Sequence, residues 1–223
     1  MGVLLMKKAV IFDMDGLMID SERVTYNEYV KKLHMLGHDD FTEDIYIRCL
    51  GKNKQGICQV FYDYYGDDFP MKEVWDDVHV WIDDSLREYV PKKKGLDKLL
   101  KYLKENQYKT IVATSSGRSR VDEILKNAQI IDYFDDTICG DEVEHGKPNP
   151  EIFLTACQRL GVTPEEAVVL EDSESGIMAG YNGNIDVICV PDMKYPEKEF
   201  AEKVTMMAES LEDVIDYLEK KNS

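Results

Sequence analysis

Apolar and polar positions follow two different periods along the second half of the chain. Short runs rich in Val and Ile predict buried strands at 109–116, 136–139, 167–170 and 186–190. Between and around them, apolar residues three or four apart predict helices at 95–106, 120–127, 150–161, 175–184 and 210–221. Strands that alternate with helices of this length predict a parallel sheet with helices on both faces.

The first part of the chain shows a different pattern. Residues 3–6 and 9–12 predict one buried strand, which Lys7 and Lys8 interrupt. Helical stripes with no strand between them then follow at 24–37, 53–66 and 72–90. The aromatic residues expected to give these stripes a core of their own are Phe61, Tyr62, Tyr65, Trp75 and Trp81.

Together these patterns predict an α/β protein with a doubly wound, Rossmann-like parallel sheet core and an inserted helical bundle. The core is expected to comprise residues 1–19 and 92–223, and the bundle residues 20–91. A chain of 223 residues can hold one large domain or a core with a smaller insertion, and its length alone does not distinguish them.

The composition narrows the classes of partner. A formal net charge of −17 argues against nucleic acid, because that binding depends on Lys and Arg at the phosphates. No apolar stretch approaches the roughly 20 residues of a membrane span. Five cysteines without a C-x-x-C pair predict reduced thiols rather than a disulfide framework or a zinc site. We therefore expect a cytoplasmic monomer with no nucleic-acid or membrane partner.

Acidic residues crowd the end of the first predicted strand. Asp13, Asp15 and Asp20 all follow residues 9–12 within a few positions. Carboxylates held this close repel one another unless a cation or a shared proton offsets the cost. The stretch FDMDGLMIDSE therefore predicts that a positive group binds at this strand end.

Together with the aspartates after the first strand, four polar groups follow predicted strands or lie in loops near them. Taken singly each is weak: a D-x-D can be a capped turn, and a lone lysine is usually a surface residue. In a doubly wound sheet, however, ligands bind outside the carboxyl ends of the strands, where all of these groups would meet. They are Asp13 and Asp15, then Thr114 and Ser115, then Lys147, then Glu171 and Asp172.

Such a set suits a magnesium ion and a phosphate group. Mg²⁺ prefers one or two carboxylates together with phosphate and water oxygens. The donors for phosphoryl oxygens would be the Thr114 and Ser115 hydroxyls and the Lys147 ammonium group. The substrate is thus expected to be a small phosphorylated metabolite.

The motifs in this order resemble the haloacid dehalogenase-like superfamily. They are D-x-D-G-x-x-x-D-S-E from Asp13, a Thr/Ser strand end, K-P-x-P from Lys147, and E-D-S-x-x-G from Glu171. The resemblance covers the whole chain, and the helical insert matches the family's cap domain. The most similar subgroup contains β-phosphoglucomutase and the sugar-phosphate and phosphoglycolate phosphatases.

The resemblance implies a role for each of these residues. Asp13 would be the nucleophile that forms an aspartyl-phosphate, Asp15 the general acid and base, and Lys147 the cation that screens the nucleophile. The implied Mg²⁺ ligands are Asp13, the carbonyl of Asp15, Asp172 and, as a further ligand, Glu171. In the cap, the substrate-selecting loop would supply Lys52, Asn53 and Lys54.

Three functions fit these motifs. The favoured one is a Mg²⁺-dependent phosphatase, and the alternative is a β-phosphoglucomutase-type phosphosugar mutase. At the positions of the mutase's cap histidine and arginine the chain has Thr25 and Lys54, which favours water as the phosphate acceptor. A non-enzymatic phospho-aspartate receiver is less expected, since receivers are shorter and lack a cap.

Overall fold

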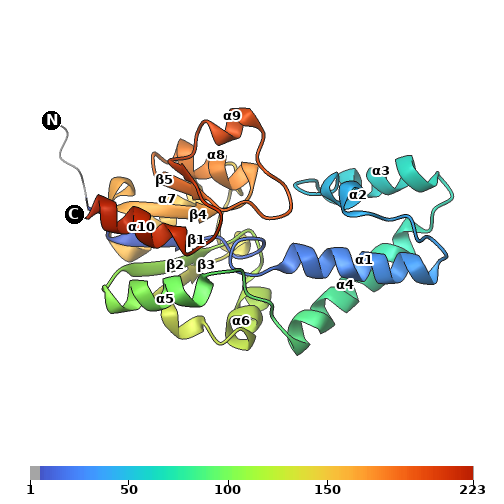
Figure 1. Cartoon of the computed structure of the whole chain (residues 1–223), viewed down its shortest axis with the longest axis horizontal. Coiled ribbons are helices and arrows are strands. Elements are labelled where there is room, and N and C mark those ends of the chain that lie inside the picture. The colour runs from blue at the N-terminus through green and yellow to red at the C-terminus, as the bar shows by residue number, and fades with distance from the viewer. Residues whose placement is uncertain (1–5, 223) are drawn as a thin grey trace. The chain divides into compact units, whose positions relative to one another are not determined.

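The central strands of the sheet are buried on both faces, which explains why their sequences are continuously apolar. The computed structural model describes residues 6–222, and six parallel strands form one sheet in the order β3-β2-β1-β4-β5-β6 (Figure 1). This confirms the predicted α/β fold class. The strands are β1 (Ala9–Phe12), β2 (Lys109–Ala113), β3 (Asp136–Ile138), β4 (Ala167–Glu171), β5 (Asp186–Cys189) and β6 (Met206–Met207).

Helices connect the strands, and each of them except the shortest, which has no buried residue, buries apolar side chains on one face. They are α5 (Leu96–Glu105), α6 (Arg118–Asn127), α7 (Glu151–Leu160), α8 (Glu174–Asn182), α9 (Lys198–Ala201) and α10 (Asp213–Lys221). Short 3₁₀ turns lie at η1 (Ile131–Tyr133), η2 (Gly140–Glu142) and η3 (Pro164–Glu166). The sequence pattern did not predict α9 or β6, because elements of two to four residues are too short to show a period.

The register of the sheet brings three strand ends together. Ile11 of β1 lies opposite Ile111 of β2 on one side and Val169 of β4 on the other. The residues that follow Phe12, Val112 and Leu170 therefore emerge at the same edge. This edge carries the polar motifs.

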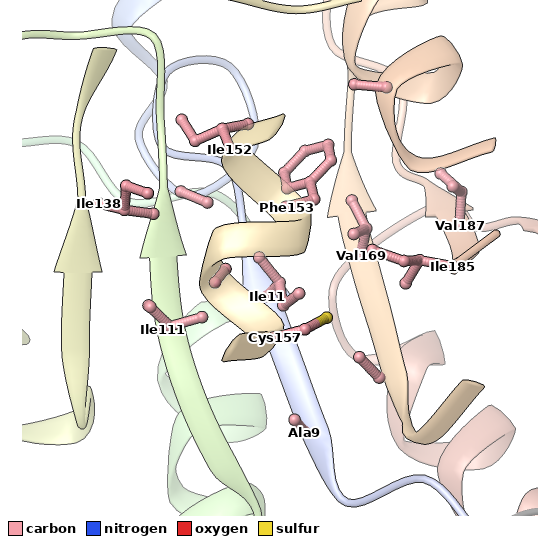
Figure 2. Packing of buried hydrophobic residues seen from close by; sticks show 14 of the residues in the cluster. Ala9, Ile11, Ile111, Ile138, Ile152, Phe153, Cys157, Val169, Ile185 and Val187 are labelled. Carbon is pink, nitrogen blue, oxygen red and sulfur yellow. The ribbon is translucent and has the colours of Figure 1, made fainter. Parts of the chain in front are cut away.

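The helix α7 forms the centre of the core on one face of the sheet. Its Ile152 and Phe153 pack against strand residues that include Ile11, Ile138 and Val169 (Figure 2). Strand residues that point to the opposite face, such as Val10, are buried as well, so both faces are covered.

The chain divides into two compact units, the first of which contains the sheet and its helices. The second unit is Ser21–Val90, and all of its regular elements are helices. It contains α1 (Ser21–Met35), α2 (Glu43–Ile47), α3 (Lys54–Tyr65) and α4 (Met71–Glu88). Within it, α1 packs against α4, and the ring of Phe61 is stacked 5.4 Å from Phe41 and 5.7 Å from Phe69.

The predicted aromatic core of this unit is only partly correct. Phe61 is buried, but Tyr62, Tyr65, Trp75 and Trp81 are half-buried. The buried rings that complete the core are those of Tyr29, Phe41, Tyr46 and Phe69. The two tryptophans instead lie beneath lysines: Lys31 Nζ lies 4.6 Å from the Trp81 ring and Lys54 Nζ 4.6 Å from the Trp75 ring.

Other expectations from the sequence have mixed outcomes. Residues 3–5 of the predicted first strand lie outside the described residues, and Met6 is exposed and belongs to no strand. All five cysteines are free. No helix within residues 6–222 is long and apolar enough to cross a membrane.

Replacing Phe153 with Ala should destabilise the fold by about 3–5 kcal/mol, because the fully buried ring leaves a cavity between α7 and the sheet. Urea unfolding measures the free-energy change. Leu154→Ala is the matched control, because Leu154 is 39% exposed in the same helix and should cost much less. Equal losses in the two variants would contradict the packing described.

Candidate active site

Asp13 is the first residue after β1 and lies at the centre of a buried charge cluster. Lys147 Nζ donates to Asp13 Oδ1 at 2.5 Å, to Glu171 Oε1 at 2.6 Å and to the Ala113 carbonyl at 3.2 Å. The Lys147 and Glu171 side chains are 4% and 1% exposed, and that of Asp13 is 10% exposed. One ammonium group therefore joins the ends of β1, β2 and β4.

Burial is the main influence on the pKa values of the two aspartates in this cluster. Burial raises the pKa of Asp13 to about 7, although Lys147 opposes the shift. Burial, followed by the charges of Glu171 and Asp13, raises the pKa of Asp172 well above its usual range. Burial opposes the Lys147 ammonium, yet Asp13 and Glu171 together raise its pKa. A divalent cation beside Asp13 and Asp172 would relieve this repulsion, so the oxygen donors present fit Mg²⁺.

Glu171 accepts four hydrogen bonds from protein donors. Its Oε1 accepts from Lys147, while its Oε2 accepts from the backbone N–H groups of Asp172 and Ser173 at 3.0 Å each and from the Ser173 hydroxyl at 2.9 Å. Gly176 makes room for the carboxylate, since a Cβ there would lie 1.8 Å from Oε1. Glu171 is thus shaped to hold Lys147 in place.

Gly16 lets Asp172 approach the loop after β1. Its φ of +82° belongs to the region that favours glycine, and an added Cβ would lie 2.3 Å from Asp172 Oδ2. The conformation and the close approach both require glycine. The D-x-D-G motif and the E-D motif therefore meet in space.

The remaining predicted core residues lie at the same edge. Thr114 is buried, and its hydroxyl accepts from Ser116 N at 3.1 Å, while Ser115 is exposed. Asp15 is half-buried and accepts from Ser116 Oγ at 2.7 Å and from Arg120 Nη2 at 2.9 Å. The sequence motifs did not predict a role for Ser116 or Arg120. Their only signal is that they follow the Thr/Ser strand end directly.

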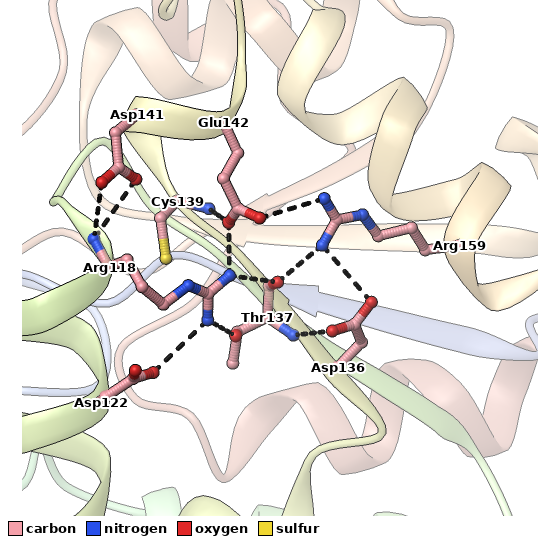
Figure 3. A network of polar contacts seen from close by, with 8 residues as sticks. All are labelled: Arg118, Asp122, Asp136, Thr137, Cys139, Asp141, Glu142 and Arg159. Atoms are coloured by element: carbon pink, nitrogen blue, oxygen red, sulfur yellow. Dashed lines mark hydrogen bonds and ion pairs between the residues drawn. The ribbon is translucent and has the colours of Figure 1, made fainter.

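A polar network joins the first turn of α6 to β3 and to the short turn after it, η2 (Figure 3). Arg118 and Arg159 both pair with Glu142, and both donate to the Thr137 carbonyl, at 3.0 and 2.9 Å. Cys139, Asp141 and Glu142 lie close enough to hold a metal ion. However, the two guanidinium groups beside Glu142 disfavour a cation there, and burial raises the pKa of the Cys139 thiol to about 11. This network is a structural clamp on the first turn of α6.

The predicted cap residues lie in the helical unit, around the start of α3. Asn53 caps this helix, because its side chain accepts from Gly56 N at 3.0 Å. Lys52 lines a cavity of about 170 Å³ within the unit. Its other walls include Glu22, Thr25, Trp75 and His79.

Comparison with known proteins identifies the family. The sequence model of the family described as "Haloacid dehalogenase-like hydrolase" matches residues 10–190. The chain belongs to this family. The superfamily predicted from the motifs is confirmed, and with it the hydrolase class.

Individual relatives of this haloacid dehalogenase-like chain include phosphatases. It is 32% identical to "Phosphorylated carbohydrates phosphatase" of Thermotoga maritima over 81% of this chain and 83% of the relative. It is 29% identical to "Probable pseudouridine-5'-phosphatase" of Drosophila melanogaster, over 89% and 87%. The crystal structure of a "putative beta-phosphoglucomutase" from Thermotoga maritima has a TM-score of 0.79 at 28% identity, over 96% and 99%. These relatives agree with the predicted subgroup.

Adding Mg²⁺ should raise the melting temperature more at pH 8 than at pH 5.5. The folded-state pKa of Asp13, about 7, lies above its usual 3.8, so its carboxylate costs folding stability as pH rises through this range. Metal binding needs the carboxylate and must displace its proton at low pH. At about 100 times the dissociation constant the gain is about 2.7 kcal/mol, or a rise of several degrees.

Thermal melts with and without Mg²⁺ at the two pH values measure this effect. Asp172→Asn keeps the side-chain volume and should remove most of the shift. A shift of the same size at both pH values, or one that survives in Asp172→Asn, would contradict the proposed metal position.

Proposed function

We propose that this hydrolase is a Mg²⁺-dependent phosphatase that releases inorganic phosphate from a small phosphorylated metabolite through an aspartyl-phosphate. A phosphorylated carbohydrate is the proposed substrate class. The observation that carries the proposal is the buried Asp13 carboxylate, held by Lys147 at the end of the central strand. Two relatives that are named as phosphatases support the reaction class.

In the first half of the proposed reaction, Asp13 attacks the phosphorus atom of the substrate. A bond forms from an Asp13 oxygen to phosphorus, and the bond to the leaving-group oxygen breaks as Asp15 gives that oxygen a proton. Lys147 orients the nucleophile and offsets its negative charge as the anionic phosphate approaches. Thr114, Ser115 and Lys147 are proposed to bind the phosphoryl oxygens.

In the second half, water replaces the aspartyl group on phosphorus. Asp15, now ionised, takes a proton from this water, and the phosphorus–Asp13 bond breaks to give inorganic phosphate and the original carboxylate. The reaction thus needs two carboxylates with different environments, one buried against Lys147 and one half-exposed.

The proposed Mg²⁺ ligands are the carboxylates of Asp13 and Asp172 and the carbonyl of Asp15. When bound, Mg²⁺ supplies positive charge that neutralises the phosphoryl oxygens and the aspartates. Glu171 was also predicted as a ligand, but its four accepted hydrogen bonds favour a supporting role. We therefore propose that Glu171 acts through Lys147.

In the helical unit, which we propose to be the cap, Lys52 is the proposed substrate contact. It lines the cavity, whereas Asn53 is engaged as the cap of α3 and Lys54 lies over Trp75. Neither nucleic acid nor a membrane is a proposed partner, because the chain is strongly acidic.

The second candidate is a phosphosugar mutase, favoured by the likeness to the putative β-phosphoglucomutase structure. Two residues argue against it. Thr25 donates its hydroxyl to the Ser21 carbonyl at 2.9 Å and cannot act as an imidazole near neutral pH. Lys54 lacks the planar fork with which a guanidinium group binds phosphate through two bonds.

Asp13→Asn should lower phosphate release by at least about 10³-fold, since an amide cannot serve as the nucleophile. The fold should persist because the variant removes a carboxylate from a cluster rich in them. Phosphate release and thermal melting are measured together, with the exposed Asp132→Asn as the control for charge. Near wild-type turnover would disprove the nucleophile assignment.

Supplying β-glucose 1-phosphate, Mg²⁺ and a bisphosphate primer should yield free phosphate faster than glucose 6-phosphate. A mutase must protect its phospho-aspartate from water until the second hydroxyl is positioned, and Thr25 and Lys54 provide weaker clamping than a histidine and an arginine. Both products are quantified over time. Faster formation of glucose 6-phosphate would establish the mutase instead.

A further inference from the structure

Both carboxylate oxygens of Asp15 are bound by side chains from the segment that follows β2. Ser116 Oγ donates to Oδ2 at 2.7 Å, and Arg120 Nη2 donates to Oδ1 at 2.9 Å. The Asp15 side chain is 26% exposed and that of Arg120 33%. Partly exposed ion pairs of this kind add little stability, so the importance of this contact lies in the orientation that it imposes.

The backbone beneath Asp15 is already fixed. Gly16 N donates to the Ile19 carbonyl at 2.9 Å, and Ile19 N donates to the Met14 carbonyl at 3.0 Å, which closes a tight loop. The side chains of Met14 and Leu17 in this loop are fully buried. Because the loop cannot move freely, the remaining freedom of Asp15 is its side-chain rotamer. Ser116 and Arg120 remove that freedom.

The base of Arg120 is fixed as well. Arg120 lies in the first turn of α6, and Arg118 in the same turn is joined to Thr137 and Glu142 through the polar network (Figure 3). The guanidinium group of Arg120 thus extends from an anchored helix end. A reactive group can be held in one geometry only by a support that is itself rigid.

We propose that Arg120 is a positioning residue that, together with Ser116, fixes the rotamer of Asp15 for proton transfer to the leaving-group oxygen. In the protonated acid, Oδ1 still accepts from Arg120, and Oδ2 carries the proton that is transferred. The inference rests on the proposed function, in which that proton moves from Asp15 as the phosphorus–oxygen bond breaks. The electron pair of the broken phosphorus–oxygen bond remains on the departing oxygen, which becomes a hydroxyl when it receives the proton. A displacement of about 1 Å can cost about 10²-fold in rate, so orientation alone gives Arg120 a large effect.

Arg120→Met should therefore act selectively on substrates that need a proton. With an alkyl monoester such as glucose 6-phosphate, kcat/KM should fall by roughly 10- to 100-fold. With p-nitrophenyl phosphate the fall should be much smaller, because nitrophenolate leaves without protonation. Inhibition by inorganic phosphate should not change, because Arg120 contacts Asp15 rather than phosphate. Arg120→Lys should restore part of the loss, since it can still donate one charged hydrogen bond.

Two further variants complete the test. Ser116→Ala should also lower kcat/KM for the alkyl monoester relative to kcat/KM for the aryl monoester, by a smaller factor. This variant tests the inference even if Arg120→Met folds poorly. Lys126→Gln is the matched control, because it removes an exposed cation from the same helix and should leave both substrates unaffected.

Equal losses on the alkyl and aryl substrates, weaker inhibition by phosphate, or unchanged kinetics in Arg120→Met and Ser116→Ala would each overturn this inference alone. A wild-type chain that releases no phosphate from any monoester would overturn the proposed function and this inference with it.

Discussion

The active site depends on one buried ammonium group shared between two carboxylates. Lys147 joins Asp13 to Glu171 and also binds the Ala113 carbonyl, so three strand ends meet at one atom. Burying these charges is costly unless each is paired and hydrogen-bonded. Two buried acids and the half-buried Asp172 share this one cation. Burial, and after it the charge of neighbouring carboxylates, raises the pKa of both aspartates. The site is therefore suited to bind a further cation.

The need to bury this charge cluster also explains two glycines near it and the role of the helix α7. Gly16 and Gly176 leave space for the Asp172 and Glu171 carboxylates, and a Cβ at either position would overlap an oxygen. The helix α7 serves both core and site, because Phe153 packs against the sheet while Lys147 Nζ lies 4.8 Å from its ring. A change in the packing of α7 would consequently move the cation, so core stability and site geometry are coupled in this chain.

In the proposed reaction, Asp13 and Asp15 have different roles although they are the same residue type two positions apart. Asp13 is nearly buried and bound by a lysine, whereas Asp15 is half-exposed and bound by an arginine and a serine from a different segment. Different environments are what separate a nucleophile from an acid and base when the residues are chemically identical. The family membership agrees with a hydrolytic use of this pair.

The sequence by itself determined the α/β class, the order of the main elements and the set of polar residues at the strand ends. These features depend only on the spacing of apolar residues and the order of motifs along the chain, and not on contacts between distant residues. Only the tertiary structure decided that Lys147 joins Asp13 to Glu171, that Arg120 binds Asp15, and that Trp75 and Trp81 lie beneath lysines. These contacts join residues far apart in the chain or depend on how a helix is rotated, and no periodicity in the sequence records either.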